Sequence, residues 1–332
     1  MKKILKIVLP LLFGIGLLAY FLSGFTAEQY QEVYRSIRQA NLWLIFLSVI
    51  LGILSHIIRA FRWEYLLEDF APKKPHKWNL IFSVGLSYLV NLGIPRSGEV
   101  ARAVTLAKYE KLPFAKVMGT ILAERVIDLL VLGVFVILGL SLEFPTIYGL
   151  LNSHFPQFTK GHFFLLAVTG FLLFLLFLWY LKVSQGSFAR KLKRFLSDIH
   201  QGLFSIFRSR HKWAFLWQTF LIWFLYLLML YVVMLAFDAT KELPLRAVLL
   251  AFIAGSLSIV LSNGGIGTYP VFVTETLSLY GIAKTDGFAF SITMWTAQTL
   301  ILILFGLLSM VMLPLINKEK PQQAAGSKKN NG

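Results

Sequence analysis

The sequence predicts an all-α, polytopic integral membrane protein: a helical bundle with six full spans, two broken or re-entrant helical hairpins and both termini inside. Of its 332 residues, 57% are apolar and only 14% are charged. In a water-soluble chain about a quarter of the residues are charged. The charged residues are concentrated in short stretches between long apolar runs. Cytosolic enzymes and secreted modules are therefore excluded as classes.

The chain has no cysteine, and its six histidines show no metal-ligand spacing. Disulfides, thiolate metal sites, iron–sulfur clusters and cysteine nucleophiles are excluded, and we expect neither a metal nor a cofactor. A net charge of +16 would favour nucleic acid as the partner of a soluble chain. In a membrane protein the same charge is typical of basic inner loops, so we expect no nucleic-acid partner.

Six apolar stretches are long enough to cross the hydrocarbon layer, which takes ~20 helical residues. They are residues 4–22, 42–60, 114–142, 163–181, 213–237 and 287–313. Two further apolar stretches are interrupted: residues 80–94 run into Pro95, and residues 247–280 are cut by Asn263 and the glycines that follow it. We interpret these two as broken helical hairpins.

Positive residues favour the cytoplasmic side of a bilayer, which orients the chain. If each full span crosses once and the first broken segment returns to its own side, Arg125 lies within a span and most other positive residues fall inside. Outside remain only Arg35, Arg38, Lys160, Lys241, Arg246 and Lys284. A full crossing by residues 80–94 would move two basic loops outside, so the first hairpin is predicted to be re-entrant. The second hairpin would bring the chain back to the same side whether it dips in once or crosses twice. The charge distribution therefore does not choose between these two topologies.

The order span, span, broken segment, span occurs twice, starting from opposite sides. This predicts an inverted repeat within a membrane domain of residues 1–316, with repeat 1 at about 1–142 and repeat 2 at about 163–316. Residues 317–332 are expected to form a disordered cytoplasmic tail. Inverted repeats with discontinuous helices are typical of secondary transporters. Residues 26–40 show helical spacing of apolar side chains and predict an amphipathic helix on the outer interface.

Ionisable side chains within a span are expensive and indicate function. Glu124 and Asp128 are four residues apart on one helix face, and Arg125 can reach Asp128. Two buried carboxylates this close share a proton or recruit cations such as Arg96 or Arg102. Two interpretations are compatible with each other: a structural ion-pair cluster that pins the hairpin to the span, and a substrate or proton site.

The first hairpin has the features of an anion site. Pro95 ends the ingoing helix, and Ser97 is a candidate N-cap of the outgoing half-helix, whose free amides would point at the membrane interior. A helix N-terminus beside Arg96 and Arg102 favours an anion, and in a bilayer the usual buried anion is a lipid phosphate. Glu99 would orient an arginine or accept a headgroup amine. The alternative is a tight turn whose arginines reach the inner headgroups.

Gly264, Gly265 and Gly267 form the second break, where glycine allows a positive φ or a close backbone approach. Asn91 and Asn263 occupy similar places in the two halves, just before the respective breaks.

Arg62 belongs to a polar group at the inner end of the second span, together with His56, Arg59 and Trp63. This group is interpreted as an interfacial anchor or, alternatively, as part of a headgroup entrance.

Several of these motifs together resemble the transmembrane-region family of lysylphosphatidylglycerol synthases, also called the flippase-like family, over about residues 4–315. They are Arg62-Trp63, the 91–102 run with its Pro-Arg-x-Gly-Glu core, Glu124-Arg125-x-x-Asp128 and the late Gly-Gly-x-Gly. In bifunctional members the membrane part is assigned the flipping of aminoacylated phosphatidylglycerol, which a separate soluble domain makes. The resemblance implies the translocating part without the synthase domain. The second hairpin departs from the family pattern at Ser262-Asn263 and Pro270.

We therefore expect a multi-pass protein of the cytoplasmic (inner) membrane of a bacterium or archaeon that flips a phospholipid or polyprenyl-linked lipid and is not itself an enzyme. A homo-oligomer is compatible with the sequence. The rival hypotheses are a membrane-embedded lipid-modifying enzyme with Glu124 or Asp128 as general base, and a non-catalytic scaffold of a lipid or glycan pathway. The candidate substrate-binding residues are Arg62, Asn91, Arg96, Glu99, Arg102, Glu124, Arg125, Asp128, Asn263, Gly264, Gly265 and Gly267.

Overall fold

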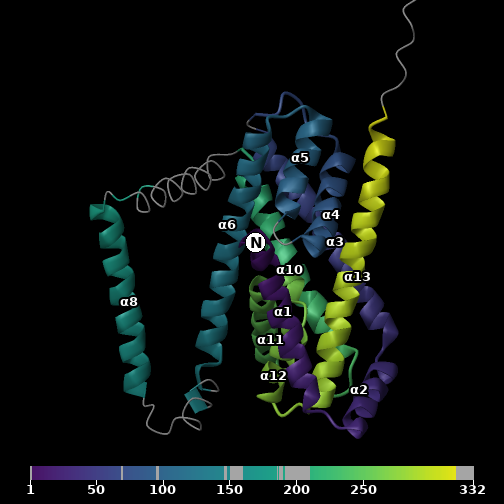
Figure 1. Cartoon of the computed structure of the whole chain (residues 1–332), viewed down its shortest axis with the longest axis vertical. Coiled ribbons are helices and arrows are strands. Elements are labelled where there is room, and N and C mark those ends of the chain that lie inside the picture. Colours follow the sequence, from purple (N-terminus) through teal and green to yellow (C-terminus); the bar gives the residue numbers. More distant parts are fainter. Residues whose placement is uncertain are drawn as a thin grey trace, which may run out of the picture.

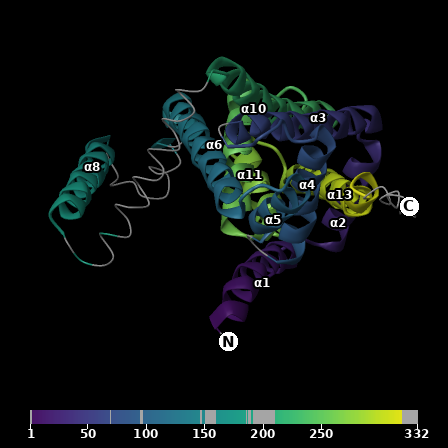
Figure 2. The same cartoon turned by 90° about the horizontal axis from the view of Figure 1, so that it is seen from above.

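The computed structural model describes residues 2–68, 70–94, 97–145, 148–149, 160–184, 186, 190 and 210–318. Within these ranges the chain is all-helical and has no strand. The helices form one bundle, with α8 standing to one side of it (Figures 1 and 2). They are α1 (Lys2–Ser23), α2 (Ala27–Gln39), α3 (Leu42–Leu67), α4 (Lys77–Gly93), α5 (Gly98–Glu110), α6 (Phe114–Leu142), α8 (Lys160–Val183), α10 (Lys212–Leu235), α11 (Leu245–Leu261), the 3-10 turn η1 (Asn263–Gly265), α12 (Thr268–Ser278) and α13 (Lys284–Ile316).

Three helices of the described chain, α3, α10 and α13, are long and apolar enough to cross a membrane. Helices α1 and α2 add a fourth if they are counted as one span bent by 110°. The all-helical membrane class predicted from the sequence is confirmed. The count of six full spans and the inverted repeat stay predictions.

The centre of the bundle is built from two long helix pairs: α3 packs along α10, and α13 packs along α4. Two clusters of buried apolar side chains fill the space between the helices. One cluster surrounds Val233 and Phe290. The other surrounds Leu80 and Ile121. These two clusters fix the helices that carry the charged residues described below.

Helices α4 and α5 form the first hairpin, whose two arms return to the same end of the bundle (Figure 1). The backbone N–H of His76, just before α4, donates to Glu110 Oε1 at the end of α5 over 2.9 Å. Asn79 Nδ2 donates to the same oxygen over 2.6 Å. The predicted return of this segment to its own side agrees with this geometry.

Helices α11 and α12 form the second hairpin, joined by η1. The arms lie so close that a Cβ on Gly255 would come within 2.6 Å of the Tyr269 ring. Arg246, at the start of α11, lies 3.5 Å from Glu143, and Tyr280, just after α12, lies beside the same carboxylate. Both arms therefore end at one end of the bundle, as they would for one dip and for two full crossings alike.

The two helix breaks meet inside the bundle. Asn263 Nδ2 donates to the carbonyl oxygen of Leu92 over 3.4 Å, which joins the second break to the tip of the first hairpin. Helix α1 lies against the second break, because a Cβ on Gly14 would sit 2.1 Å from the carbonyl oxygen of Ile266. Only a residue without a side chain allows this backbone approach.

The residues predicted as an amphipathic helix form α2, which begins with a capping box between Thr26 and Gln29. Val33 is its buried residue, and the helix packs on α13. At the other end of α13, Asn317 exchanges hydrogen bonds of 2.7 and 3.1 Å with Asn79. The predicted disordered tail lies outside the described residues except for its first two positions, of which Asn317 is held in place.

Candidate functional site

Three arginines and two carboxylates from three helices meet within the bundle. We call this group the charge cluster: Arg59 and Arg62 from α3, Arg102 from α5, and Glu124 and Asp128 from α6. Glu124, Arg62 and Arg102 are at most 1% exposed, and Arg59 is 7% exposed. Ion pairs as deeply buried as these need matched geometry, because each charge has left water.

Glu124 is the acceptor at the centre of the cluster. Its Oε1 lies 2.7 Å from Arg59 Nε and 3.2 Å from Arg62 Nη2. Its Oε2 lies 3.1 Å from Arg102 Nη1. One carboxylate thus joins three guanidinium groups from two other elements, so α3, α5 and α6 are held together at a single point.

Asp128 lies one helical turn further along α6 and contacts the same arginines. It accepts from Arg62 Nη2 over 3.0 Å and also pairs with Arg59. Arg59 completes its hydrogen bonds with the hydroxyls of Tyr88 and Tyr226, at 3.3 and 3.5 Å. The guanidinium of Arg59 is therefore fully used by the protein.

Arg102 and Arg62 have donors to spare. Nε and Nη2 of Arg102 and Nε of Arg62 are buried and have no hydrogen-bond partner among the described residues. Arg102 is held by its single link to Glu124 and by the Trp63 ring, whose centroid lies 3.8 Å from the guanidinium carbon. Buried donors without a partner are costly, so this arrangement favours a ligand or water that accepts from them.

The charges of the cluster do not cancel. Three guanidinium groups face two carboxylates, which leaves one positive charge within the bundle. The flanking pair of Arg125 Nε and Glu99 Oε1, 3.6 Å apart, adds no net charge. The buried excess matches one monovalent anion.

The first break is stabilised differently from the expectation. Ser97 precedes α5 as predicted, but its side chain makes no cap hydrogen bond and instead bonds the carbonyl oxygen of Ile94. Asn91 takes over the capping role: its Oδ1 accepts from the backbone N–H of Gly98 over 2.8 Å. Ser97 thus occupies the predicted N-cap position, but the capping oxygen comes from Asn91, which reaches across the break from α4.

The interpretation of Arg59, Arg62 and Trp63 as an interfacial anchor is wrong. Helix α3 continues past the predicted end at residue 60 to Leu67, and all three side chains are buried. Glu124 and Asp128 pair with Arg59 and Arg62, which stabilises the charged side chains inside the bundle and allows the helix to continue past them. The headgroup-entrance alternative stays a prediction.

The predicted site residues thus fall into three groups. Arg62, Arg102, Glu124 and Asp128 lie in the charge cluster, with Glu99 and Arg125 beside it. Asn91 lies at the first break. The second break is formed by Asn263, Gly264, Gly265 and Gly267, and Asn263 contacts the tip of the first hairpin. Arg96 lies outside the described residues.

Sequence reasoning missed Arg59, which contacts both carboxylates. The signal was present: His56, Arg59 and Trp63 share a helix face at spacings of three and four. That face was assigned to the membrane surface because the apolar run ends at residue 60. Arg59 becomes recognisable as a site residue only when α6 places its carboxylates opposite.

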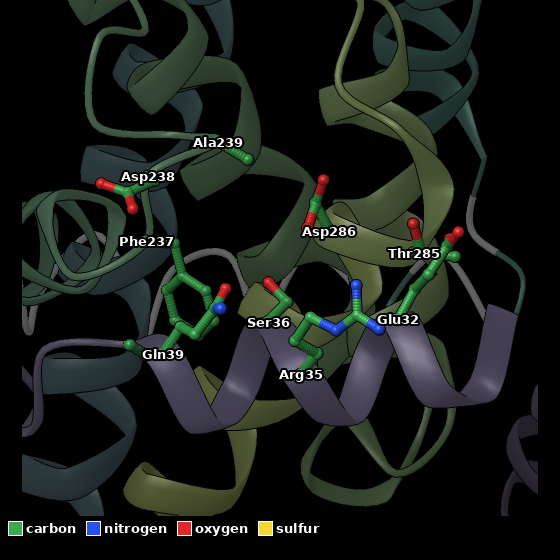
Figure 3. Close-up of a pocket in the computed structure, with 10 residues that line it drawn as sticks. Glu32, Arg35, Ser36, Gln39, Phe237, Asp238, Ala239, Thr285 and Asp286 are labelled. Carbon is green, nitrogen blue, oxygen red and sulfur yellow. The ribbon is translucent and has the colours of Figure 1, made fainter. Parts of the chain in front are cut away.

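A separate pocket lies where α2 meets the segment after α10 and the start of α13 (Figure 3). Its walls include Glu32 and Arg35 of α2, Asp238 after α10, and Thr285 and Asp286 at the start of α13. Asp238 is already bonded to Lys241 over 2.7 Å. The pocket combines exposed acids with one arginine and shares no residue with the charge cluster, so the cluster remains the candidate site.

Comparison with known proteins supports a family assignment. The family model for the lysylphosphatidylglycerol synthase transmembrane region matches residues 7–306. A membrane protein described as "UPF0104 membrane protein MJ1595", from Methanocaldococcus jannaschii, is 26% identical over 149 residues, which cover 42% of each chain. The match thus spans less than half of that relative. No solved structure is detectably similar to the chain.

Proposed function

The chain belongs to the lysylphosphatidylglycerol synthase transmembrane-region family, and on that premise we propose that this membrane protein moves a lipid or lipid-linked substrate between the two leaflets. Its substrate is a phospholipid or a polyprenyl-linked lipid, and its location is the cytoplasmic membrane. The headgroup binds at the helix breaks, beside the charge cluster. Translocation of a whole lipid requires such a polar station, because the hydrocarbon layer offers a headgroup no hydrogen bonds.

One observation carries this proposal: the charge cluster holds one uncompensated positive charge together with spare guanidinium donors. A phosphodiester carries one negative charge and accepts paired hydrogen bonds from arginine. Nε and Nη2 of Arg102 form such a fork, and Trp63 fixes its plane. Binding the phosphate would balance the charge and satisfy both donors.

The remaining residues would prepare and guide this step. Glu124 holds Arg102 in place and keeps its second edge free. Asn91 and Asn263 fasten the two breaks to their neighbours, so that the broken backbone retains partners inside the bundle. Arg96, adjacent to the first break in sequence, stays a candidate for headgroup binding from the sequence alone.

The test is a translocation assay with purified protein in liposomes that contain a fluorescent phosphatidylglycerol. Dithionite added outside bleaches only the label in the outer leaflet, so translocation appears as continued bleaching of the inner pool. We expect Arg102→Gln to slow translocation roughly tenfold or more, because a charge-assisted hydrogen bond is worth about 1.5–3 kcal/mol. Arg102→Lys keeps the positive charge but loses the paired donors. We expect its translocation rate to lie between those of the wild type and Arg102→Gln.

The matched control is Lys284→Gln, which removes an exposed positive charge at the far end of the bundle. All variants are compared by size-exclusion chromatography, so that loss of folding is not mistaken for loss of function. Mass spectrometry of the recovered lipid separates translocation from a lipid-modifying activity, which changes the mass. Equal translocation rates for wild type and Arg102→Gln would contradict the proposal.

A further inference from the structure

A charged pair is exposed on an otherwise apolar surface, at the seam between α5 and α6. The side chain of Arg125 is 38% exposed and that of its partner Glu99 is 25% exposed. On α6, Leu122 and Leu129 flank Arg125 on the same face and are exposed by 49% and 62%. On α5, Val100 stands next to Glu99 and is also exposed. Such a surface is typical of one that faces lipid.

Both side chains of the pair lie far along their helices from the lysines that are expected at the inner headgroups. Arg125 follows Lys116 by nine residues on α6, and Glu99 precedes Lys108 by nine residues on α5. At ~1.5 Å per residue both lie about 14 Å from those lysines, near half of the ~30 Å hydrocarbon layer. Both helices therefore place the pair at the same depth, where an exposed charge is expensive.

The ion pair of Arg125 and Glu99 leaves polar atoms of both side chains without a hydrogen bond among the described residues. Oε2 of Glu99 and Nε of Arg125 are buried atoms without a hydrogen-bond partner among the described residues. Their ion pair is 3.6 Å long, too long for a hydrogen bond, so both side chains can still bond another polar group. A structural salt bridge that only pinned α5 to α6 would be expected to close this distance and use these atoms.

The pair also leads directly to the charge cluster. Arg125 Nη1 lies 3.7 Å from Asp128 Oδ2, and Asp128 in turn binds Arg62. On α5, Arg102 follows Glu99 by three residues and so lies on the same helix face. Ion pairs thus link the partly exposed Arg125 through Asp128, Arg62 and Glu124 to Arg102.

We propose that the α5–α6 seam is a lateral portal, through which the headgroup of a monoanionic phospholipid passes from the bilayer to the charge cluster. The acyl chains stay outside, against Val100, Leu122 and Leu129. Arg125 attracts the phosphate at the entrance, and Glu99 holds Arg125 until the headgroup arrives. Helices α5 and α6 lie side by side, with α8 apart from the bundle in both views (Figures 1 and 2). This portal deepens the proposed function and rests on it.

The experiment places a photoreactive residue, p-benzoylphenylalanine, at Leu122 and, as matched control, at Leu138. Both leucines lie on α6 and both are 49% exposed. Each variant is reconstituted into liposomes of equal phosphatidylglycerol and phosphatidylcholine, irradiated, and digested for mass spectrometry of the lipid adducts. We expect the ratio of phosphatidylglycerol to phosphatidylcholine adducts to be several-fold higher at residue 122 than at residue 138.

Two further substitutions separate the portal from general attraction of anionic lipid. Arg125→Leu, added to the variant at residue 122, is expected to bring the adduct ratio down to that of residue 138. Lys108→Leu removes an exposed positive charge from the same hairpin and is expected to leave the ratio unchanged. Equal adduct ratios at residues 122 and 138 would overturn the portal, as would an enrichment that survives Arg125→Leu.

The translocation assay is run on the same proteoliposomes, so that the two proposals can fail separately. Translocation without enrichment at residue 122 overturns the portal and leaves the proposed function standing. Enrichment that depends on Arg125, without translocation, supports a headgroup portal and contradicts the proposed function.

Discussion

Glu124 is the residue on which the charge cluster depends. Its two oxygens contact three arginines, while Asp128 alone cannot neutralise them. A buried ion pair is weak support for stability as a whole, but removing one partner leaves an uncompensated charge in a medium that solvates it poorly. We expect the cost of removing one partner to be largest at Glu124, because this side chain is fully buried.

We predict that Glu124→Gln lowers the free energy of unfolding by about 3–5 kcal/mol, the usual effect of breaking a buried ion pair. The measurement is denaturant-induced unfolding in detergent, followed by tryptophan fluorescence. Asp238→Asn is the control: its side chain is 90% exposed and pairs with Lys241, so we expect no measurable change. A Glu124→Gln variant as stable as this control would contradict the structural part of the account.

Residue contacts were predictable where spacing along one helix decides them. The i,i+4 spacing of Glu124 and Asp128 predicted that both face the same cations, and the structure shows both paired with Arg62, and Glu124 with Arg102. Arg59 and Asn91 were harder, because their partners come from other helices. Pairing across elements depends on how the helices pack, and a single sequence does not contain that information directly.

At the scale of elements, the second break is the most constrained segment. Gly264, Gly265 and Gly267 all have positive φ, at 65°, 75° and 73°. Side chains are strained in this region of backbone conformation. The contact with α1 adds a steric limit, because a Cβ on Gly267 would come within 2.0 Å of the carbonyl oxygen of Gly14.

We predict that Gly14→Leu displaces α1 from the second break and lowers the thermal unfolding midpoint by several degrees. The substituted side chain would collide with backbone atoms of Ile266, which cannot move aside as a side chain does. Gly16→Leu is the matched control on the same helix, since a Cβ there meets nothing within 4 Å. Unfolding midpoints measured in parallel should separate the two variants; equal midpoints would mean that α1 does not rest on the break.

The existence and type of the helices were predictable from apolar length. Residues 114–142 coincide with α6, and both hairpins were found from their breaks. The predicted end of the second span, residue 60, lies seven residues before the observed end of α3. A hydropathy argument ends a span at charged residues such as arginine. Here the carboxylates of α6 keep two arginines inside the bundle, and this compensation becomes visible only in three dimensions.

At the scale of the whole molecule, the loops sort into two ends. One end holds Lys74 and His211, with Glu68 contacting both side chains. The other holds Asp238, the start of α13 and α2, which together line the pocket of Figure 3. The charge bias predicts that the first end lies inside the cell and the second outside.

We predict that a single cysteine at Asp238 reacts with a membrane-impermeant maleimide in intact cells. A cysteine at Lys74 should react only after the cells are permeabilised. The chain has no native cysteine, so each label reports one position. Each side chain is exposed, which keeps accessibility within the protein from limiting the reaction. The reverse labelling pattern would refute the predicted orientation.

Some helix contacts have a counterpart in the other half of the chain, while the inverted repeat itself stays a prediction. The pair α4 and α5 corresponds to α11 and α12, and the contact of α4 with α13 corresponds to that of α11 with α6. The charge cluster breaks this correspondence, since its acids come from α6 and the described part of α13 has none within its apolar span. The proposed function therefore has a single headgroup site, beside the first hairpin.

The most direct test of the account is a structure determined in nanodiscs of phosphatidylglycerol. We predict density for a lipid phosphate within hydrogen-bond distance of Nε and Nη2 of Arg102, with acyl chains leaving between α5 and α6. The Arg102→Gln variant, solved under the same conditions, should lack this density and retain the helix arrangement. A cluster that remains without a lipid phosphate in the wild type, its spare donors occupied by protein groups alone, would contradict the central claim.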